Sequence, residues 1–311
     1  MAIIGSFTKN NPTRPDIYQR VTDAIIRDLE QGTRSWIKPW TTSSKKSAIR
    51  PLRHDGTPYR GINVLILWSE AAGRGYASST WMTYRQAQSL GGHVRKGECG
   101  TTIVYAKTIE RSNDDDPAAG EVTIERIPLL RAYTVFNADQ VDGLQLPLSA
   151  NSSLSAEAPS TRIDRADKFI AATGATIVHK GNRACFIPSR DIIEMPLYRQ
   201  FVDTPTSSAG EAYYATLLHE LIHYTSSPGR CNRDIGKSFG DNAYAREELV
   251  AELGAAFLCA DLGIAPEPRP DHAAYLATWL TVLKSDKRAI FSAAALAQKA
   301  TDWLVAKSGA G

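Results

Sequence analysis

The first clearly patterned segment of the chain has the apolar spacing of an amphipathic helix. Across residues 15–32, PDIYQRVTDAIIRDLEQG, an apolar residue recurs every four positions, and most positions between are polar. Residues four apart lie on one face of a helix. Proline and aspartate stand at the start of the segment and glycine at its end, and these are typical helix boundaries. The predicted apolar face consists of Ile17, Val21, Ile25 and Leu29.

The rest of the first half alternates between helix and strand signals. Residues 61–75, GINVLILWSEAAGRG, are strongly apolar and end in glycine, which predicts a buried helix. Residues 101–111 and 121–136 are rich in β-branched and aromatic residues, and they predict two strands. The polar stretch 111–121 between them predicts a hairpin loop. We therefore expect this half to be α+β.

Beyond residue 143 the pattern changes to long helices. The stretch 144–160, LQLPLSANSSLSAEAPS, is rich in serine, alanine and proline and predicts a linker. It divides the chain into two expected domains, residues 1–143 and 161–311, and the fold class of the whole is expected to be α+β. In the second part we predict helices over 159–174, 210–226, 243–263, 273–285 and 289–307, with short strands near 175–180, 183–188 and 190–196.

Composition excludes several classes of protein. The 311 residues, 43% of them apolar, are enough for about two cored domains. The sequence has no apolar run of about 18 residues, so we expect no transmembrane helix and no membrane partner. The N-terminus lacks the pattern of a secretion signal. The four cysteines form no CxxC pair, which fits reduced thiols in a cytoplasmic protein.

Charge is unevenly distributed along the chain. Residues 1–109 contain 16 Lys and Arg against 7 Asp and Glu, a net charge of +9. The remaining residues carry a net charge of −6, because the whole chain has 36 basic and 33 acidic residues. A basic first part favours a polyanionic partner, although an ordinary solvated surface explains the charge equally well.

The stretch LLHELIHYT, residues 217–225, contains two histidines four positions apart with a glutamate after the first. On a helix, His219 and His223 point the same way and can reach one metal ion at Zn–N distances of about 2.0–2.1 Å. Glu220 is displaced around the helix, where it can take a proton from a water molecule held at the metal. The stretch therefore predicts a zinc site, and another divalent transition metal is an alternative. The competing interpretation is a hydrogen-bonded histidine pair on an ordinary helix.

A third ligand must come from elsewhere in the chain. The metzincin continuation HExxHxxGxxH is absent, because Ser226 and Gly229 occupy its glycine and last histidine positions. Cys231 offers a thiolate, but its loop position favours a bystander role. The helix REELVAELGAAF, residues 246–257, carries two glutamates on one otherwise apolar face, and buried carboxylates need a partner.

These two glutamates are Glu248 and Glu252, whereas Glu247 is expected on a solvated face. HELIH followed by EELVAE resembles the gluzincin arrangement of HExxH with a downstream ExxxD. The resemblance implies that Glu248 is the third zinc ligand and that Glu252 orients a ligand histidine from behind. The sequence has Glu where that pattern has Asp, so a shift of the ligand to Glu252 remains open. The strand preceding HELIH, residues 185–196, resembles the zincin edge strand that aligns peptide substrates.

Several motifs of the first half together resemble the N-terminal domain of ArdC-type antirestriction proteins. They are WIKPW (36–40), YRGIN (59–63), WMTYRQA (81–87), GGHVRKGECGTTIVYA (91–106) and YTVFNADQ (133–140). Proteins of that family also carry a zincin-like C-terminal domain, so the resemblance covers nearly the full chain. It implies a plasmid-type protein that protects incoming DNA from host restriction and binds single-stranded DNA.

The side chains of the first half are compatible with that implication. Aromatic faces stack on unpaired bases, and Lys and Arg neutralise phosphates. For any single aromatic residue, Trp36, Trp81 and Tyr105 included, a place in the core is an equally good interpretation. The predicted nucleic-acid contacts are Trp36, Lys38, Trp40, Tyr59, Arg60, Trp81, Tyr84, Arg85, Arg95 and Lys96.

The expected function is therefore single-stranded-DNA binding joined to a zinc metallopeptidase that acts on a host protein or peptide. In that mechanism Glu220 is the general base and passes its proton to the leaving amine. Tyr244 and His272 are candidate donors to the oxyanion. The main alternative is a DNA-binding module whose metal is purely structural. A DNA mimic is a third reading, which the basic first part disfavours.

Overall fold

In the first half of the chain one longer helix and one short helix contact the strands, while the first helix packs against a helix of the second half. The sheet has the strand order β1-β2-β5-β4, in which β1 and β2 are parallel and the other pairs antiparallel. A second, two-stranded sheet joins β3 and β6. The elements are α1 (Ile17–Glu30), β1 (Leu52–Arg53), α2 (Ile62–Arg74), β2 (Thr80–Met82), α3 (Tyr84–Ser89), β3 (His93–Val94), β4 (Thr101–Ser112), β5 (Ile124–Asn137) and β6 (Val141–Asp142).

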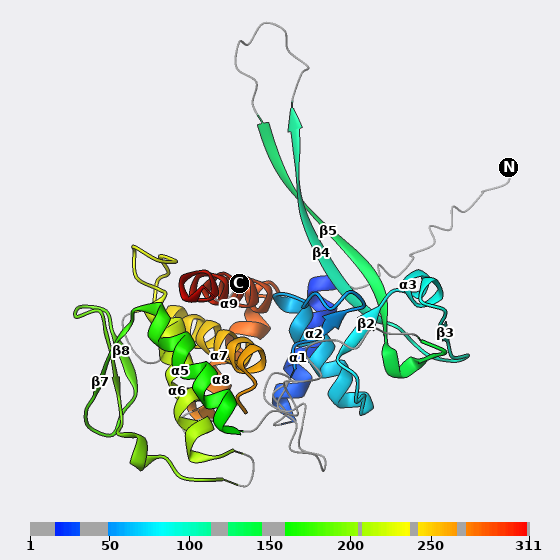
Figure 1. The fold of residues 1–311 in the computed structure, drawn as a ribbon. Coiled ribbons are helices and arrows are strands. Elements are labelled where there is room, and N and C mark those ends of the chain that lie inside the picture. Colours follow the sequence, from blue (N-terminus) through cyan, green and yellow to red (C-terminus); the bar gives the residue numbers. More distant parts are fainter. Residues whose placement is uncertain are drawn as a thin grey trace, which may run out of the picture.

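This structure is a computed structural model, and its α+β fold class agrees with the sequence prediction. Asp16 caps α1, and Val21, Ile25 and Leu29 are buried on the predicted face. The predicted strands form the β4–β5 hairpin, which extends away from the body of the molecule (Figure 1). The structure describes residues 16–31, 49–112, 124–144, 159–204, 207–236, 242–265 and 272–309, except for the side chains of 106–112, 124–130, 159 and 272–275.

The second half sets a bundle of helices against a three-stranded sheet with the order β7-β9-β8. β9 is central, and β8 is the free edge nearest α6. All the helices and strands predicted for this half are present, with bounds that differ by a few residues. They are α5 (Pro159–Thr173), β7 (Thr176–His179), β8 (Cys185–Ile187), β9 (Ile192–Met195), α6 (Ala209–Tyr224), α7 (Asn242–Leu262), α8 (His272–Ser285) and α9 (Ala289–Ser308).

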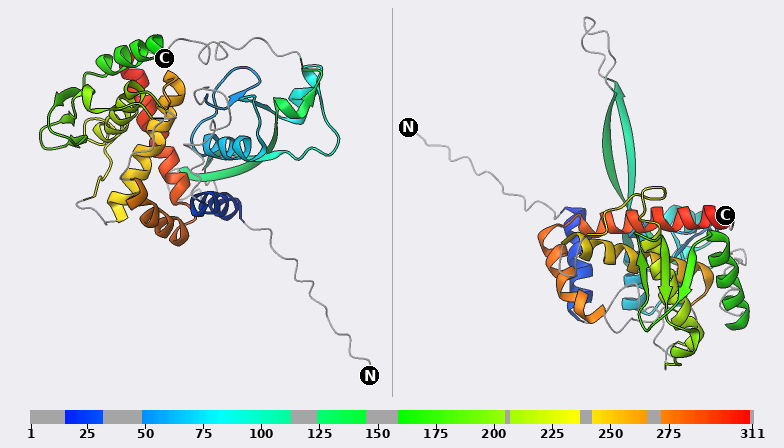
Figure 2. Two further views of the ribbon diagram at one scale, coloured as in Figure 1. Left: turned by 90° about the horizontal axis from the view of Figure 1, so that it is seen from below. Right: turned by 90° about the vertical axis from the view of Figure 1, so that its left-hand side faces the viewer.

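The two halves share one hydrophobic core. α1 packs against α8, and α9 packs against α7, α5 and α2, so helices of both halves lie side by side (Figures 1 and 2). The side-chain oxygen of Gln298 on α9 accepts hydrogen bonds from the Gly61 backbone and from Arg50, both 3.1 Å long. Arg50 also pairs with Asp261 at 3.0 Å. The predicted boundary at 144–160 stays a prediction, since residues 145–158 lie outside the described part.

None of the helices in the described ranges is long and apolar enough to cross a membrane.

A glycine sets the distance between α6 and α7. A β-carbon built at Gly254 would lie 2.7 Å from Cδ1 and 2.8 Å from Cγ1 of Ile222 on the neighbouring helix. Such distances are well below van der Waals contact, so a larger residue at this position would push the two helices apart. The close approach matters because α6 and α7 carry the residues of the candidate metal centre.

We predict that Gly254→Ala destabilises the protein by about 1–3 kcal/mol, because overpacking outweighs the gain in helix propensity. Gly73→Ala is the matched control: Gly73 also lies inside a helix, α2, and nothing lies within 4 Å of a β-carbon there. That substitution should stabilise by about 0.5–1 kcal/mol. Urea unfolding measures both, and equal stabilisation by the two alanines would contradict the tight contact.

Candidate metal centre

Two imidazoles face each other on α6. The helix starts with a capping box in which Ser208 and Glu211 satisfy each other's backbone groups, and it runs through HELIH without interruption. His219 and His223 lie one turn apart, and their Nε2 atoms are 3.1 Å from one another. Two nitrogens on a tetrahedral zinc ion at bond lengths of about 2.0–2.1 Å lie about 3.3 Å apart. The spacing of the two Nε2 atoms therefore suits one shared ion.

The third donor of the cluster comes from α7. Glu248 places one carboxylate oxygen 3.5 Å from His219 Nε2 and the other 3.5 Å from His223 Nε2. Within the described residues these three side chains form one group whose ligand atoms all lie within 4.8 Å of one another. The structure thus brings together the two histidines and the glutamate predicted as ligands, and their donor set fits a divalent transition metal.

A second pair of carboxylates stands behind the imidazoles. Glu252 lies 3.3 Å from Nδ1 of His219, as expected for a residue that orients that histidine. Glu247 lies 3.1 Å from Nδ1 of His223. A proton held on each Nδ1 by these carboxylates leaves the Nε2 lone pairs directed at the same point. Two neutral imidazoles would direct their Nε2 lone pairs at each other, and either a proton or a metal ion between the two nitrogens removes that repulsion.

The expectation that Glu247 is solvated is wrong, because its side chain is only 3% exposed. Arg233 explains the burial: its guanidinium makes hydrogen bonds of 2.9 and 2.7 Å to the two oxygens of Glu247. Arg233 also donates to Thr225 and to the backbone oxygen of Ile222 near the end of α6. The pair therefore fixes both the carboxylate behind His223 and the end of the helix that carries it.

The electrostatics favour a cation at this place. Four carboxylates are buried on the two helices of the cluster, those of Glu220, Glu247, Glu248 and Glu252, and the guanidinium of Arg233 pairs with Glu247. Burial alone would lower the pKa of His223, but hydrogen bonds to Glu247 and Glu248 outweigh it and raise that pKa to about 10. Burial would likewise raise the pKa of Glu248, and hydrogen bonds from the two histidines instead hold it well below its ordinary value. In the metal-free chain, a proton on His223 compensates part of the negative charge.

Glu220 is held by the edge strand of the small sheet. The backbone N–H of Phe186 on β8 donates a 2.9 Å hydrogen bond to Oε2 of Glu220. The predicted edge strand is therefore this three-residue strand, whereas β9 is covered on both sides. A carboxylate fixed by a backbone N–H on the same helix as the two histidines is placed for proton transfer.

The cluster opens into a cavity of about 540 Å³. Edge-strand residues, including Cys185 and Phe186, form one wall, and Tyr244 lies on another. The side chain of His272 lies outside the described part, so its predicted role stays a prediction. Cys231 is buried elsewhere, with its sulfur 3.9 Å from the backbone oxygen of Lys299, in agreement with a bystander role.

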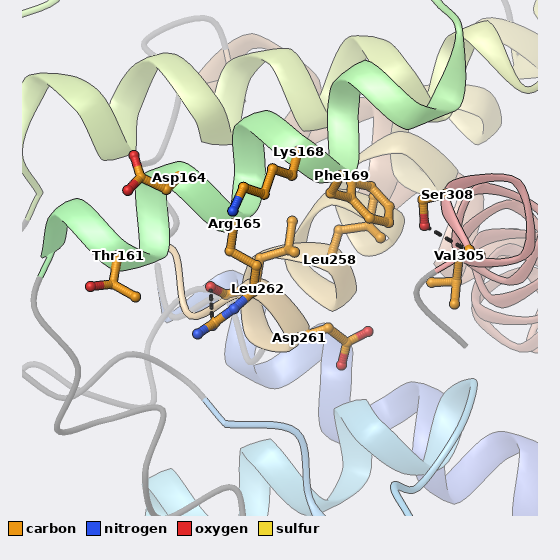
Figure 3. A pocket seen from close by; sticks show the side chains of 11 residues that line it. Thr161, Asp164, Arg165, Lys168, Phe169, Leu258, Asp261, Leu262, Val305 and Ser308 are labelled. Carbon is orange, nitrogen blue, oxygen red and sulfur yellow. Dashed lines mark hydrogen bonds between the residues drawn. The ribbon is translucent and has the colours of Figure 1, made fainter.

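A second cavity, of about 590 Å³, lies between α5 and the C-terminal ends of α7 and α9 (Figure 3). Lys168 and Asp261 stand at its rim and Phe169 and Leu258 at its apolar floor. It contains no imidazole or thiol, so the metal cluster and Glu220 belong to the first cavity alone.

Comparisons with known proteins decide the family. The model of zincin-like metallopeptidases matches residues 164–296, and the model of the N-terminal domain of anti-restriction factor ArdC matches residues 15–136. The metal-free crystal structure of antirestriction protein ArdC from plasmid R388 is 44% identical and has a TM-score of 0.76. It covers 95% of this chain and 98% of its own. The chain belongs to the ArdC family.

Other relatives extend this result. A Mn(II)-bound structure of R388 ArdC is 44% identical with a TM-score of 0.73, and covers 94% of this chain and 98% of its own. Protein y4eC of Sinorhizobium fredii is 42% identical over 303 residues, which are 96% of this chain and 95% of y4eC. DNA primase TraC of Escherichia coli is 38% identical, and the match covers 93% of this chain but only 27% of TraC. The zincin-like domain, the Mn(II)-bound ArdC and the His–Glu cluster together indicate a divalent metal ion.

The nucleic-acid contacts expected from the ArdC resemblance are scattered in the structure. Tyr84, Arg85 and Lys96 are exposed, as a contact requires. The prediction for Tyr59 and Trp81 is wrong in this structure, because both rings are buried in the shared core and offer no face to a base. Three of the predicted residues, Trp36, Lys38 and Trp40, lie outside the described part.

The two remaining predicted contacts are arginines that already have acidic partners. Arg60 pairs with Asp302 on α9, across the junction of the two halves. Arg95 lies 2.8 Å from Glu98 and 3.4 Å from Asp142. A phosphate would have to compete with these carboxylates, so we expect Lys96 to be a better phosphate contact than Arg95.

We predict that Glu248→Ala weakens metal binding more than Glu252→Ala or Glu247→Ala, because it removes a ligand atom. Each of the other two changes removes only a partner of a ligand histidine and should cost about 10- to 100-fold in affinity. Glu194→Ala is the control, since that carboxylate pairs with Arg190 outside the cluster. Competition with a fluorescent chelator gives the affinities, and a larger loss for Glu252→Ala would assign the third ligand to Glu252.

Metal binding should also release a proton. With a pKa of about 10, His223 is protonated near neutral pH in the metal-free chain, whereas a ligand imidazole must be neutral. We expect about one proton released per metal ion at pH 7.5, and an apparent affinity that rises with pH until about pH 10. Titration calorimetry in two buffers with different ionisation enthalpies counts the protons. An apparent affinity that does not change between pH 6.5 and 9 would contradict the protonated His223.

Proposed function

We propose that this chain is an antirestriction protein that binds single-stranded DNA and acts in the cytoplasm as a zinc-dependent peptidase. The observation that carries the peptidase part is the geometry between α6 and α7. Three donors converge there, and a fourth side chain, Glu220 on the same helix as the two histidines, lines the open cavity beside them. Catalytic zinc sites have three protein ligands and an open position, whereas structural sites are closed by four.

Each residue of the cluster has a separate role in the proposed reaction. His219, His223 and Glu248 would hold the ion, and the Mn(II)-bound structure of the R388 relative makes another divalent transition metal the alternative to zinc. Zinc, when bound, would act as a Lewis acid and lower the pKa of a bound water towards about 7. Glu220 takes a proton from the attacking water and delivers it to the leaving amine nitrogen. The Phe186 N–H holds the Glu220 carboxylate in the orientation needed for both transfers.

The edge strand β8 suits an extended peptide substrate. A free edge pairs with such a chain through main-chain hydrogen bonds, which select extended conformation without selecting sequence. Ala184, Cys185 and Phe186 line the same cavity as the histidines, so a peptide along this edge would bring its backbone to the cluster. A host protein or peptide is therefore the substrate class we propose.

The DNA part of the proposal is supported by family membership and by charge. The first 109 residues carry a net charge of +9, and exposed aromatic and basic side chains, among them Tyr84, Arg85 and Lys96, lie on this half. Stacking requires unpaired bases, so single strands should bind more tightly than duplex. The alternative is a DNA-binding module whose metal only stabilises the fold. The open cavity at Glu220 favours the peptidase.

Glu220→Gln separates these possibilities, since it keeps the shape of the side chain and removes its basicity. We expect the zinc-loaded wild-type protein to cleave an unfolded model substrate such as casein. The variant should be slower by at least about 100-fold. Both proteins should bind one zinc ion and the same fluorescent single-stranded oligonucleotide with equal affinity, and duplex more weakly.

Two results would count against this function. Zinc-loaded wild-type protein that cleaves nothing while still binding the metal would favour the structural role. Equal affinity for single strands and duplex would remove the single-strand preference, whatever the outcome of the cleavage assay.

A further inference from the structure

Two tyrosines stand exposed where the β4–β5 hairpin leaves the body of the molecule. Tyr105 is 51% exposed and Tyr133 is 43% exposed, although aromatic rings are costly to leave in water. Their ring centroids are 6.4 Å apart and their planes are nearly perpendicular, at 81°. Neither tyrosine was among the predicted nucleic-acid contacts, and for Tyr105 a place in the core was an equally good interpretation.

The strand register places both rings on one face of the hairpin. Tyr105 is paired with Arg131 and Ile103 with Tyr133, and residues directly opposite each other in a sheet share a face. Tyr105 and Ile103 also share that face, since they are two residues apart. Arg131 lies directly opposite Tyr105 and therefore shares that face with the tyrosine pair. Its side chain is exposed, so its charge is accessible to a ligand.

Along the hairpin, the side chains on this face change from buried to exposed. At the base, Ile103 and Val135 are buried in the core, and β4 packs on α2 there. Further out the hairpin extends beyond the body (Figures 1 and 2), and the tyrosines are the first residues on this face that the body does not cover. Tyr84 belongs to a different surface, because it packs edge-on against Phe136, whose side chain points to the opposite face of the sheet.

We propose that Tyr105 and Tyr133 form a stacking platform for bases of single-stranded DNA and that Arg131 contacts an adjoining phosphate. This inference rests on the proposed DNA binding and gives it a location. Aromatic side chains on an exposed sheet face stack on unpaired bases with little sequence preference. The net charge of +9 over residues 1–109 supplies the complementary field for a polyanion.

The test uses the full chain and a fluorescent single-stranded oligothymidylate. Tyr105→Ala and Tyr133→Ala should each weaken binding by about 5- to 100-fold, the loss expected for one stacked base. Phenylalanine at either position keeps the ring and should keep most of the affinity. Tyr198→Ala is the matched control: Tyr198 is 48% exposed but lies in the second half, and its loss should leave affinity unchanged.

Two further measurements identify the chemistry of the contact. The tyrosine variants should keep the salt dependence of the wild-type protein, whereas Arg131→Ala should make that dependence shallower by removing one phosphate contact. An abasic strand offers phosphates without bases. Wild-type protein and the tyrosine variants should bind it with equal affinity.

The outcomes distinguish this inference from the function on which it rests. If the wild-type protein binds no single-stranded DNA, the DNA part of the proposed function fails and the platform with it. If the wild-type protein binds and both alanine variants bind equally well, only the platform is overturned. Urea unfolding of the same variants shows whether the ring pair then serves merely to hold the two strands together.

Discussion

Buried carboxylates between α6 and α7 are the constraint on which the site depends. An isolated ionised carboxylate in a protein interior costs several kcal/mol unless a partner compensates it. Here Glu220, Glu247, Glu248 and Glu252 are all buried within one cluster. Arg233 compensates Glu247, Glu248 and Glu252 share the two imidazoles, and Glu220 accepts the Phe186 N–H, so the metal-free cluster still carries excess negative charge. A divalent ion at the meeting point of the two Nε2 atoms relieves that excess and replaces the proton on His223.

Packing outside the cluster serves to keep the two helices at the required distance. Gly254 allows α7 to approach Ile222 closely, and Arg233 ties the end of α6 to Glu247 on α7. The edge strand β8 reaches the same place through the hydrogen bond from Phe186 to Glu220. Three elements far apart in sequence therefore fix the positions of the ligands and of the general base.

The first half of the chain packs directly against the helices that carry this centre. α9 packs on α7, and its Gln298 bonds to Arg50 and to the backbone of Gly61 in the first half. Arg50 in turn pairs with Asp261 on α7, the helix that carries Glu248. The β4–β5 hairpin packs on α2, α2 on α9 and α9 on α7, so packed elements connect the hairpin with the helix that carries Glu248.

Local patterns explain what could be predicted from the sequence. Helical spacing places the two histidines on one face of α6 and the two glutamates on one face of α7, and the gluzincin resemblance implied that Glu248 joins the histidines; the structure brings His219, His223 and Glu248 together as expected. The short helix α3 was missed, although Thr83 and Gln86 form a capping box that signals its start. The partners that depend on distant contacts could not be inferred.

Glu247 and the aromatic residues of the first half illustrate that limit. Spacing along α7 cannot show that Arg233, a loop residue, covers the face on which Glu247 lies. Burial of Tyr59 and Trp81 depends on α9 and the other helices of the shared core, and exposure of Tyr105 depends on where the hairpin leaves the body. Each of these is a property of the assembled fold.

Anomalous diffraction from crystals of the zinc-loaded protein, measured on both sides of the zinc absorption edge, tests the central claim most directly. Our account predicts one strong peak per chain, within bonding distance of Nε2 of His219, Nε2 of His223 and the carboxylate of Glu248, and with Glu220 outside that distance. A peak bound by a different set of residues, or no peak in crystals shown by analysis to contain zinc, would contradict it.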